Sequence, residues 1–255
     1  MNTENCIETH ALTKVYDGKP AVDRLNLAVR RGSFYGFLGP NGAGKSTTMR
    51  MLTGITAPTS GDATLLGFRV SRSPLKIKRR IGVVPEELCL FENLTAREYL
   101  AFVGRMYKMP RHVAAQRTEE LLALLGIADT GKTMVLEFSH GMKKKLTLAA
   151  ALIHDPELLF LDEPFEGIDA LASRTIRAVL DRLIQRGATI FLTSHILEIV
   201  ERLCTDVGII HEGRLVRQGP LAELAAGGSL ERAFVEAVGE PDETGISLSW
   251  LGGGG

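Results

Sequence analysis

The sequence is poor in the features that mark several classes of protein. Its 255 residues include 3 cysteines, Cys6, Cys89 and Cys204, and only 6% aromatic residues. Widely spaced cysteines without a C-x-x-C pair do not form a disulfide framework, so we expect a reducing, cytosolic compartment. The 6 histidines form no cluster with metal-ligand spacing, so zinc is not expected.

An excess of charge of one sign and a long hydrophobic run are also lacking. The 30 basic residues balance 30 acidic ones, and a neutral chain lacks the basic surface of a general nucleic-acid binder. Apolar stretches such as residues 146–153 are far shorter than the roughly 20 residues that a membrane helix requires. The N-terminus has acidic residues and no apolar run, unlike a secretory signal. With 45% hydrophobic residues, the chain is expected to fold as a globular protein.

Short apolar runs of strand length alternate with segments of helical spacing. Residues 34–38, 158–161 and 188–193 predict buried strands, and residues 45–52 and 170–186 predict helices. This alternation is typical of a parallel sheet in an α/β fold.

Two regions depart from this alternation. Residues 7–15 and 21–29 alternate apolar and polar side chains on either side of Asp17-Gly18, which predicts an antiparallel strand pair. Residues 94–153 have an almost entirely helical pattern, which predicts a helical insertion into the α/β core.

A phosphate-binding loop lies between the strand at 34–38 and the helix that follows it. Residues 39–46 match the pattern G-x-x-x-x-G-K-[ST], whose glycines let consecutive backbone N–H groups face one phosphate. Lys45 would reach the β- and γ-phosphates, and the Ser46 hydroxyl would bind Mg²⁺. The expected nucleotide-binding residues of this loop are Gly39, Pro40, Asn41, Gly42, Ala43, Gly44, Lys45, Ser46 and Thr47.

Two carboxylates follow the apolar run 158–161. Carboxylates at the end of a buried strand are costly unless they meet a cation or reach a polar site. Beside the phosphate loop, Asp162 is expected to hold Mg²⁺, and Glu163 is expected to orient and deprotonate the attacking water.

Together these residues resemble the nucleotide-binding subunit of ATP-binding cassette (ABC) transporters, over about residues 7–224. That family adds an adenine-stacking aromatic, a Q-loop, a signature segment, a D-loop and a switch histidine. The matching positions here are Tyr16; Glu86; Ser139, His140, Gly141 and Met142; Asp169; and His195. The residues of the phosphate loop most resemble the exporter-type branch, which includes ABC-2-like multidrug ATPases.

The resemblance implies an architecture and a set of ligands. It implies a P-loop NTPase, an α/β fold with a RecA-like parallel sheet core, an antiparallel β subdomain and an inserted helical subdomain at about 88–155. The ATPase domain would cover 1–225, and a C-terminal helix with a flexible glycine-rich tail would cover 226–255. ATP and Mg²⁺ are the implied cofactors, with Glu163 and His195 as catalytic residues and Ser46, Glu86 and Asp162 around the metal.

The resemblance also implies partners. In this family two ATPase domains pair head to tail, and each ATP lies between the phosphate loop of one domain and the signature segment of the other. A second nucleotide-binding subunit, identical or different, is therefore expected, together with a separate membrane-spanning permease. The chain would then lie in the cytoplasm, on the inner face of the membrane, and power export.

The match to the family has three departures. His140 replaces a glycine and Met142 replaces a glutamine of the usual signature, whereas Gly141 is kept. We expect the site to remain active because backbone donors carry most of the contact. Glu86 replaces the usual glutamine of the Q-loop, and its carboxylate can still bind Mg²⁺.

Structural interpretations compete with these roles. Tyr16 could be a half-buried strand aromatic, His195 a hydrogen-bonded histidine at a strand end, and Ser139 a helix N-cap. The lysines at 143–145 are expected to form a solvated helix face, because three consecutive positions cannot all face one phosphate.

Two other functions stay open on sequence alone. A cassette ATPase acting on nucleic acid or ribosomes shares the motifs, although the zero net charge counts against it. A P-loop kinase for a small molecule would explain residues 39–46 but would leave residues 139–142 and His195 without a role.

Overall fold

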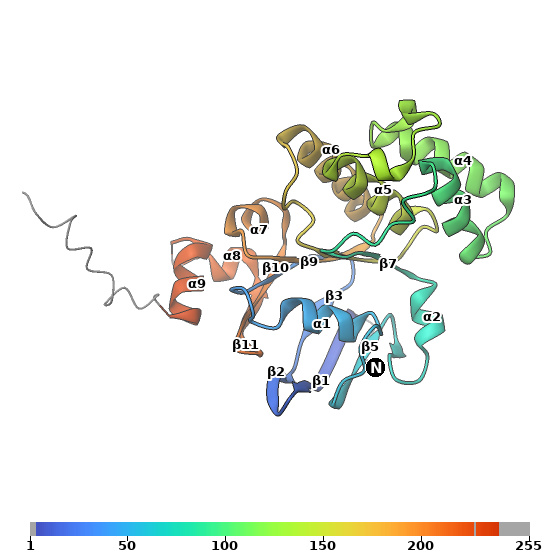
Figure 1. The fold of residues 1–255 in the computed structure, drawn as a ribbon. Helices are drawn as coiled ribbons and strands as arrows, with labels where there is room; N and C mark the ends of the chain where they lie inside the picture. Colours follow the sequence, from blue (N-terminus) through green and yellow to red (C-terminus); the bar gives the residue numbers. More distant parts are fainter. Residues whose placement is uncertain (1–3, 227, 240–255) are drawn as a thin grey trace, which may run out of the picture.

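The computed structural model describes residues 4–226 and 228–239. It has two β-sheets with helix α1 between them, and further helices on the outer face of the larger sheet (Figure 1). The predicted α/β architecture is confirmed. The predicted glycine-rich tail lies outside the described residues.

The larger sheet has the strand order β11-β10-β4-β9-β8-β7, and all neighbours are parallel except β11 and β10. Its strands are β4 (Phe34–Leu38), β7 (Ile81–Val84), β8 (Leu158–Asp162), β9 (Thr189–Ser194), β10 (Asp206–His211) and β11 (Arg214–Pro220). The three predicted buried strands, β4, β8 and β9, lie next to one another at its centre.

The smaller sheet is antiparallel, as predicted. It contains β1 (Asn5–Tyr16), β2 (Lys19–Leu25), β3 (Ala28–Arg30), β5 (Ser60–Leu65) and β6 (Phe68–Arg69). The turn between β1 and β2 is at Asp17-Gly18, where both residues have positive φ, as this hairpin turn requires. The run predicted at 21–29 forms two strands, because the chain bulges at Arg24 (φ 47°) and leaves β2 after Leu25.

The helices follow the predicted segments closely. The helices predicted at 45–52 and 170–186 are α1 (Lys45–Leu52) and α6 (Ala170–Gln185). Residues 94–153 contain α3 (Ala96–Met106), α4 (Arg111–Leu124), the short 3₁₀ segments η1 (Ala128–Thr130) and η2 (Val135–Glu137), and α5 (His140–Leu152). The other helices are α2 (Pro74–Lys78), α7 (Leu197–Leu203), α8 (Leu221–Leu224) and α9 (Leu230–Val238).

Helix ends are fixed by local chemistry. At the start of α3, Thr95 and Glu98 form a reciprocal capping box. Ser139 caps α5 and Ser229 caps α9, because each side-chain oxygen accepts a backbone N–H of the first turn. No helix in the described part of the chain is long and apolar enough to cross a membrane.

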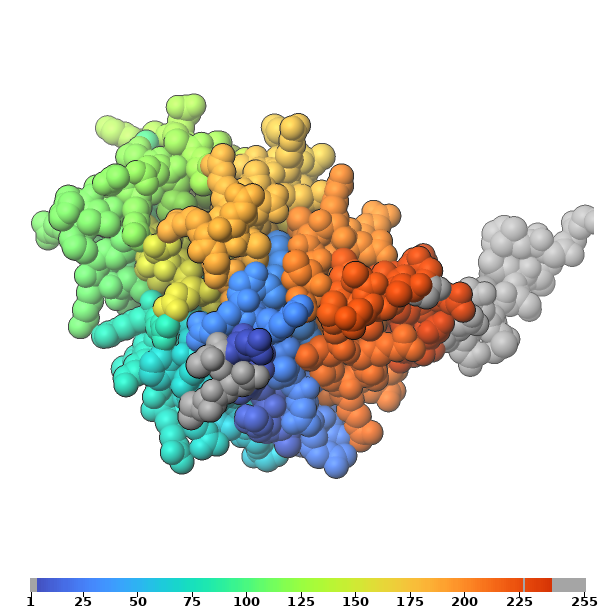
Figure 2. Space-filling model, turned by 180° about the vertical axis from the view of Figure 1, so that it is seen from behind, coloured from blue at the N-terminus to red at the C-terminus, as the bar shows by residue number. Residues whose placement is uncertain are grey.

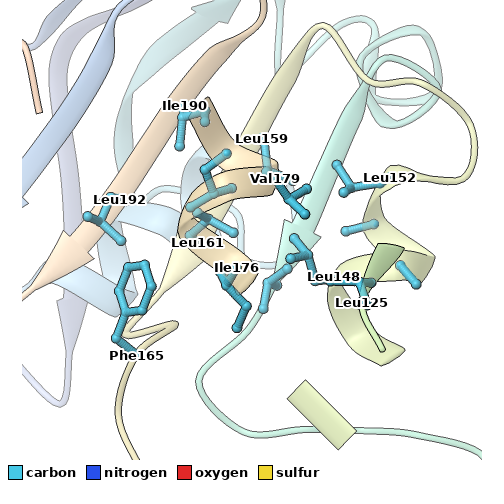
Figure 3. Packing of buried hydrophobic residues seen from close by; sticks show 14 of the residues in the cluster. Leu125, Leu148, Leu152, Leu159, Leu161, Phe165, Ile176, Val179, Ile190 and Leu192 are labelled. Atoms are coloured by element: carbon cyan, nitrogen blue, oxygen red, sulfur yellow. The ribbon is translucent and has the colours of Figure 1, made fainter. Parts of the chain in front are cut away.

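Alternate side chains of the parallel strands face two separate cores. In β8, Phe160 packs toward α1 and the smaller sheet, whereas Leu159 and Leu161 face the outer helices. Figure 3 shows these two leucines beside Ile176 and Val179 of α6. Because both faces are covered, the strand is apolar up to Asp162, where it reaches the edge of the sheet.

The outer helices divide between the two ends of the large sheet. Seen from behind, the segment of α3 and α4 (green) and the segment of α8 and α9 (red) lie at opposite ends of the molecule (Figure 2). The carboxyl ends of the central strands lie between them, with one loop leaving each strand.

Candidate functional site

The loops after four adjacent parallel strands meet at one edge of the large sheet. They follow β4, β9, β8 and β7, which neighbour one another in that order. The carboxyl edge of a parallel sheet is where α/β proteins place their ligands. A cavity of ≈ 350 Å³ opens there, lined by Ala21, Asn41, Gly42, Gly44, Lys45, Ser46, Thr47, Glu86, Glu163, Glu166 and His195.

The phosphate loop joins β4 to α1 through positions that only glycine suits. Gly44, the residue before α1, has φ 107°, and a Cβ there would lie 2.5 Å from the carbonyl oxygen of Ala21. A Cβ on Gly39 would lie 2.4 Å from the carbonyl oxygen of Ile210. No side chain caps the start of α1, so its positive end faces the cavity as an anion site.

Lys45 lies inside this loop and is 7% exposed. Its Nζ donates to the carbonyl oxygens of Gly39 at 2.8 Å and Pro40 at 3.2 Å, and lies 3.8 Å from Oε1 of Glu163. Burial lowers the pKa of Lys45, while the carboxylates of Glu163, Asp162 and Glu86 act in the opposite direction. A cation held among loop carbonyls is placed to meet an anion entering the cavity.

Oxygen ligands for a hard cation gather at the end of β8. Asp162 is buried, its Oδ1 accepts the hydroxyl of Thr193, and Oγ of Ser46 lies 3.4 Å from the same oxygen. Glu86, on the loop after β7, lines the cavity. Carboxylate and hydroxyl oxygens are the donors that Mg²⁺ prefers, so these residues fit that ion.

Glu163 directs its carboxylate into the cavity, between Lys45 and His195. It is 6% exposed, and its backbone has φ 44°, a costly conformation for a residue with a side chain. The backbone N–H of Glu163 donates to Thr193. Oε1 of Glu163 lies 3.0 Å from Nδ1 of His195, yet no described donor is aligned to hydrogen-bond to it. Such a carboxylate can accept a proton from water held between it and a phosphate.

The signature segment, residues 139–142, lies outside this cavity. Ser139 and His140 are exposed at the start of α5, and the Ser139 oxygen accepts the N–H of Met142 at 3.3 Å. Gly141 faces Asp169, which caps α6 by accepting the N–H of Ala172. This hydrogen bond holds the pKa of Asp169 below its usual value. In the structure Gly141 of the signature segment and Asp169 of the D-loop therefore lie side by side, and neither residue lines the cavity at the phosphate loop.

Tyr16 also lies outside the lining of the cavity. It ends β1, its side chain is 45% exposed, and Nζ of Lys14 lies 5.1 Å from the ring centre. The adjoining turn leads to Ala21, which does line the cavity. Stacking of Tyr16 on adenine stays a prediction.

Three residues of this region were missed by the sequence analysis. Thr193 donates to Asp162 and accepts from Glu163, and its signal was a hydroxyl at the end of an otherwise apolar strand. Glu166 lines the cavity. Lys144 was predicted to lie on a solvated helix face, and that prediction is wrong: it is buried and contacts the backbone after β8.

Comparison with known proteins identifies the family of this chain. Residues 22–166 match the family described as ABC transporter. The chain belongs to the ABC transporter family. It is 38% identical over 220 residues to the linearmycin resistance ATP-binding protein of Bacillus subtilis (strain 168), covering 86% of this chain and 71% of that protein. It is 43% identical over 219 residues to the bacitracin transport ATP-binding protein of Bacillus licheniformis, with the same coverage of each.

A solved structure gives the same result. The ABC ATPase superposes with a TM-score of 0.85 on the structure of an ATP-binding subunit of an ABC transporter, at 30% identity, covering 91% of this chain and 99% of that one. The P-loop NTPase fold and the prediction of an ATPase that powers transport are thus confirmed. The nucleic-acid ATPase and small-molecule kinase alternatives are not favoured by these relatives.

Proposed function

We propose that this ABC ATPase binds ATP in the cavity after β4 and hydrolyses it there. Backbone N–H groups of the phosphate loop and the Lys45 ammonium would bind the phosphates, while Ser46, Asp162 and Glu86 would hold Mg²⁺. When bound, Mg²⁺ neutralises charge on the phosphates. Glu163 would accept the proton of the attacking water, and His195, 3.0 Å away, would keep that carboxylate and the γ-phosphate in line.

We propose further that hydrolysis takes place in a head-to-tail pair. Ser139 and His140 of the signature segment are exposed, and the segment does not line its own chain's cavity, so it could face the γ-phosphate of another subunit. There the start of α5 would supply N–H groups, and Gly141 would allow close approach. The partner is a second copy of this chain or a different chain with the same motifs.

The pair would drive export through a separate membrane-spanning permease and would lie on the inner face of the membrane by this contact. An apolar hollow of ≈ 360 Å³ supports this proposal, because it offers a surface where the permease could dock. Ile55, Cys89, Tyr99 and Tyr107 are among its lining residues, and Ile55 is exposed, as is nearby Phe91. The relatives named for linearmycin resistance and bacitracin transport support an antibiotic as the class of substrate.

One observation carries the hydrolytic function. Lys45, Glu163 and His195 come from segments far apart in the sequence, and Oε1 of Glu163 lies 3.8 Å from Nζ of Lys45 and 3.0 Å from Nδ1 of His195, with Asp162 directly before Glu163. A site that only bound nucleotide would need Lys45 and Asp162 and not the others.

The test is the rate of phosphate release per chain as the protein concentration rises. We expect the specific rate to rise and then reach a plateau, because a pair is needed, with ADP and free phosphate as the only products. Glu163→Gln should lower the rate by about 10³-fold and, with ATP, should move the protein to twice its mass in sedimentation. A phosphorylated acceptor, or a full rate from a permanently single chain, would contradict the proposal.

A further inference from the structure

Lys144 is a buried cation in the second turn of α5. It lies in a run of three lysines, but its side chain is 4% exposed, whereas Lys143 is partly exposed and pairs with Glu92. Residues at i, i+4 and i+8 share one face of a helix, and Leu148 and Leu152 continue the buried face that Lys144 begins. The cation is therefore held inside the protein by the same helix face that packs the core.

The ammonium group of Lys144 contacts the backbone of the residues after β8. Nζ donates to the carbonyl oxygen of Glu163 at 3.0 Å and to the carbonyl oxygen of Glu166. The Glu166 N–H donates to the Glu163 carbonyl and closes a tight turn, residues 163–166, which we call the catalytic turn. Lys144 thus binds both ends of this turn.

The other side of the Glu163 backbone is held by β9. The backbone N–H of Glu163 donates to the carbonyl oxygen and to the hydroxyl of Thr193, each at 3.3 Å. The backbone of Glu163 is therefore held between Thr193 on one side and Lys144 on the other. This matters because φ at Glu163 is 44°, a conformation that persists only where the surroundings hold it.

A purely structural role would not call for a lysine at this position. Burial lowers the pKa of Lys144 because it disfavours the charged form, and carboxylates at Glu166, Glu163 and Glu86 counteract this effect. An apolar side chain of the same length would fill the space without that desolvation cost. Charged donors make the stronger hydrogen bonds, which suits a contact that must keep a strained peptide in place.

We propose that Lys144 is a positioning residue for hydrolysis, which ties the start of α5 to the peptide that carries the Glu163 carboxylate. The inference rests on the proposed function of Glu163. Since α5 begins with the signature segment, a shift of this helix on meeting a partner's nucleotide would reach Glu163 of the same chain through one side chain. Binding at one site would thereby set the geometry of the other.

The kinetic test compares Lys144→Met with two other variants, Lys143→Met and Lys144→Arg. We expect Lys144→Met to lower kcat by about 10²-fold, the effect of misplacing a catalytic group by about 1 Å, with KM for ATP within about threefold of the original. Lys144→Arg should recover most of kcat, because it keeps a charged donor. Lys143→Met removes a neighbouring cation from the same helix and should leave kcat unchanged. An unchanged kcat for Lys144→Met, or an equal loss in Lys143→Met, would overturn the inference.

A second measurement needs no turnover. Hydrogen–deuterium exchange of the nucleotide-free protein should be faster by at least about tenfold at the amides of the catalytic turn in Lys144→Met, and unchanged in Lys143→Met. Equal exchange in both variants would overturn the inference even if kcat had fallen. If the original protein released no phosphate, the proposed function would fail, while the exchange data would still decide whether Lys144 holds the turn.

Discussion

The starts of helices α1 and α5 differ in their surroundings. The start of α1 has no side-chain cap, and it faces a cavity whose other walls come from the same chain, including Glu86, Glu163 and His195. The start of α5 is capped by Ser139, and both Ser139 and His140 are exposed. The start of α1 therefore lies in a cavity formed by its own chain, whereas the start of α5 lies at the surface.

The glycines at these two helix starts differ in the same way. A Cβ on Gly44 would lie 2.5 Å from a carbonyl oxygen of the same chain, and φ there is 107°. A Cβ on Gly141 would meet nothing closer than 3.8 Å, and its φ is not positive. The fold of one chain therefore requires glycine at 44 and has room for a Cβ at 141. If Gly141 is needed so that a group can approach the backbone closely, that group belongs to another molecule.

The largest expected effect comes from replacing each of these two glycines with valine. Gly141→Val should leave ATP binding by the single chain and the melting temperature nearly unchanged. It should lower turnover by about 10²- to 10³-fold, because its side chain would keep the backbone N–H groups from reaching the phosphate, an effect comparable to removing one such donor. Gly44→Val should lower both ATP binding and stability, because it strains the chain itself. Fluorescent-nucleotide titration, thermal unfolding and phosphate release measure the three quantities. Normal turnover in Gly141→Val would refute the comparison.

A smaller effect is expected inside the cavity. Glu86→Gln replaces a carboxylate by an amide, a weaker ligand for Mg²⁺. The Mg²⁺ concentration for half-maximal turnover should rise about fivefold, equivalent to about 1 kcal/mol. Glu87→Gln, an exposed neighbour outside the cavity lining, is the matched control. Identical Mg²⁺ curves for both variants would remove Glu86 from the metal site.

The smallest effect concerns the cap itself. Ser139→Ala removes the N-cap of α5 and should cost about 1 kcal/mol of unfolding free energy, or about 2–4 °C in melting temperature. Thr95→Ala, at the capping box of α3, should cost a similar amount. Only Ser139→Ala should also lower turnover. Equal turnover in the two variants would mean that Ser139 is a structural cap alone.

The sequence was sufficient for features that arise from local chemistry. The phosphate loop, the strand and helix around it, the Asp17-Gly18 turn and the Ser139 cap each depend on residues within a few positions of one another. Glu163 was selected because two carboxylates follow an apolar strand, and His195 through the family resemblance; they do meet, 3.0 Å apart.

Features that depend on packing between distant segments were predicted less well. The run 21–29 became two strands because the chain bulges at Arg24 and its second half, β3, pairs with an earlier part of β1. Lys144 was assigned to solvent since three consecutive lysines conceal which one continues the buried helix face. The role of Thr193 depends on β9 lying beside β8, which no local pattern specifies.

By itself, the sequence determined the chemical groups of this ATPase and the elements that carry them, because propensity, capping and turn chemistry act over a few residues. Only the tertiary structure decided the strand order β4-β9-β8-β7, the burial of Lys144 against the catalytic turn, and the position of Gly141 beside Asp169. These depend on which faces pack together and on the free energy of burying them, a property of the whole chain.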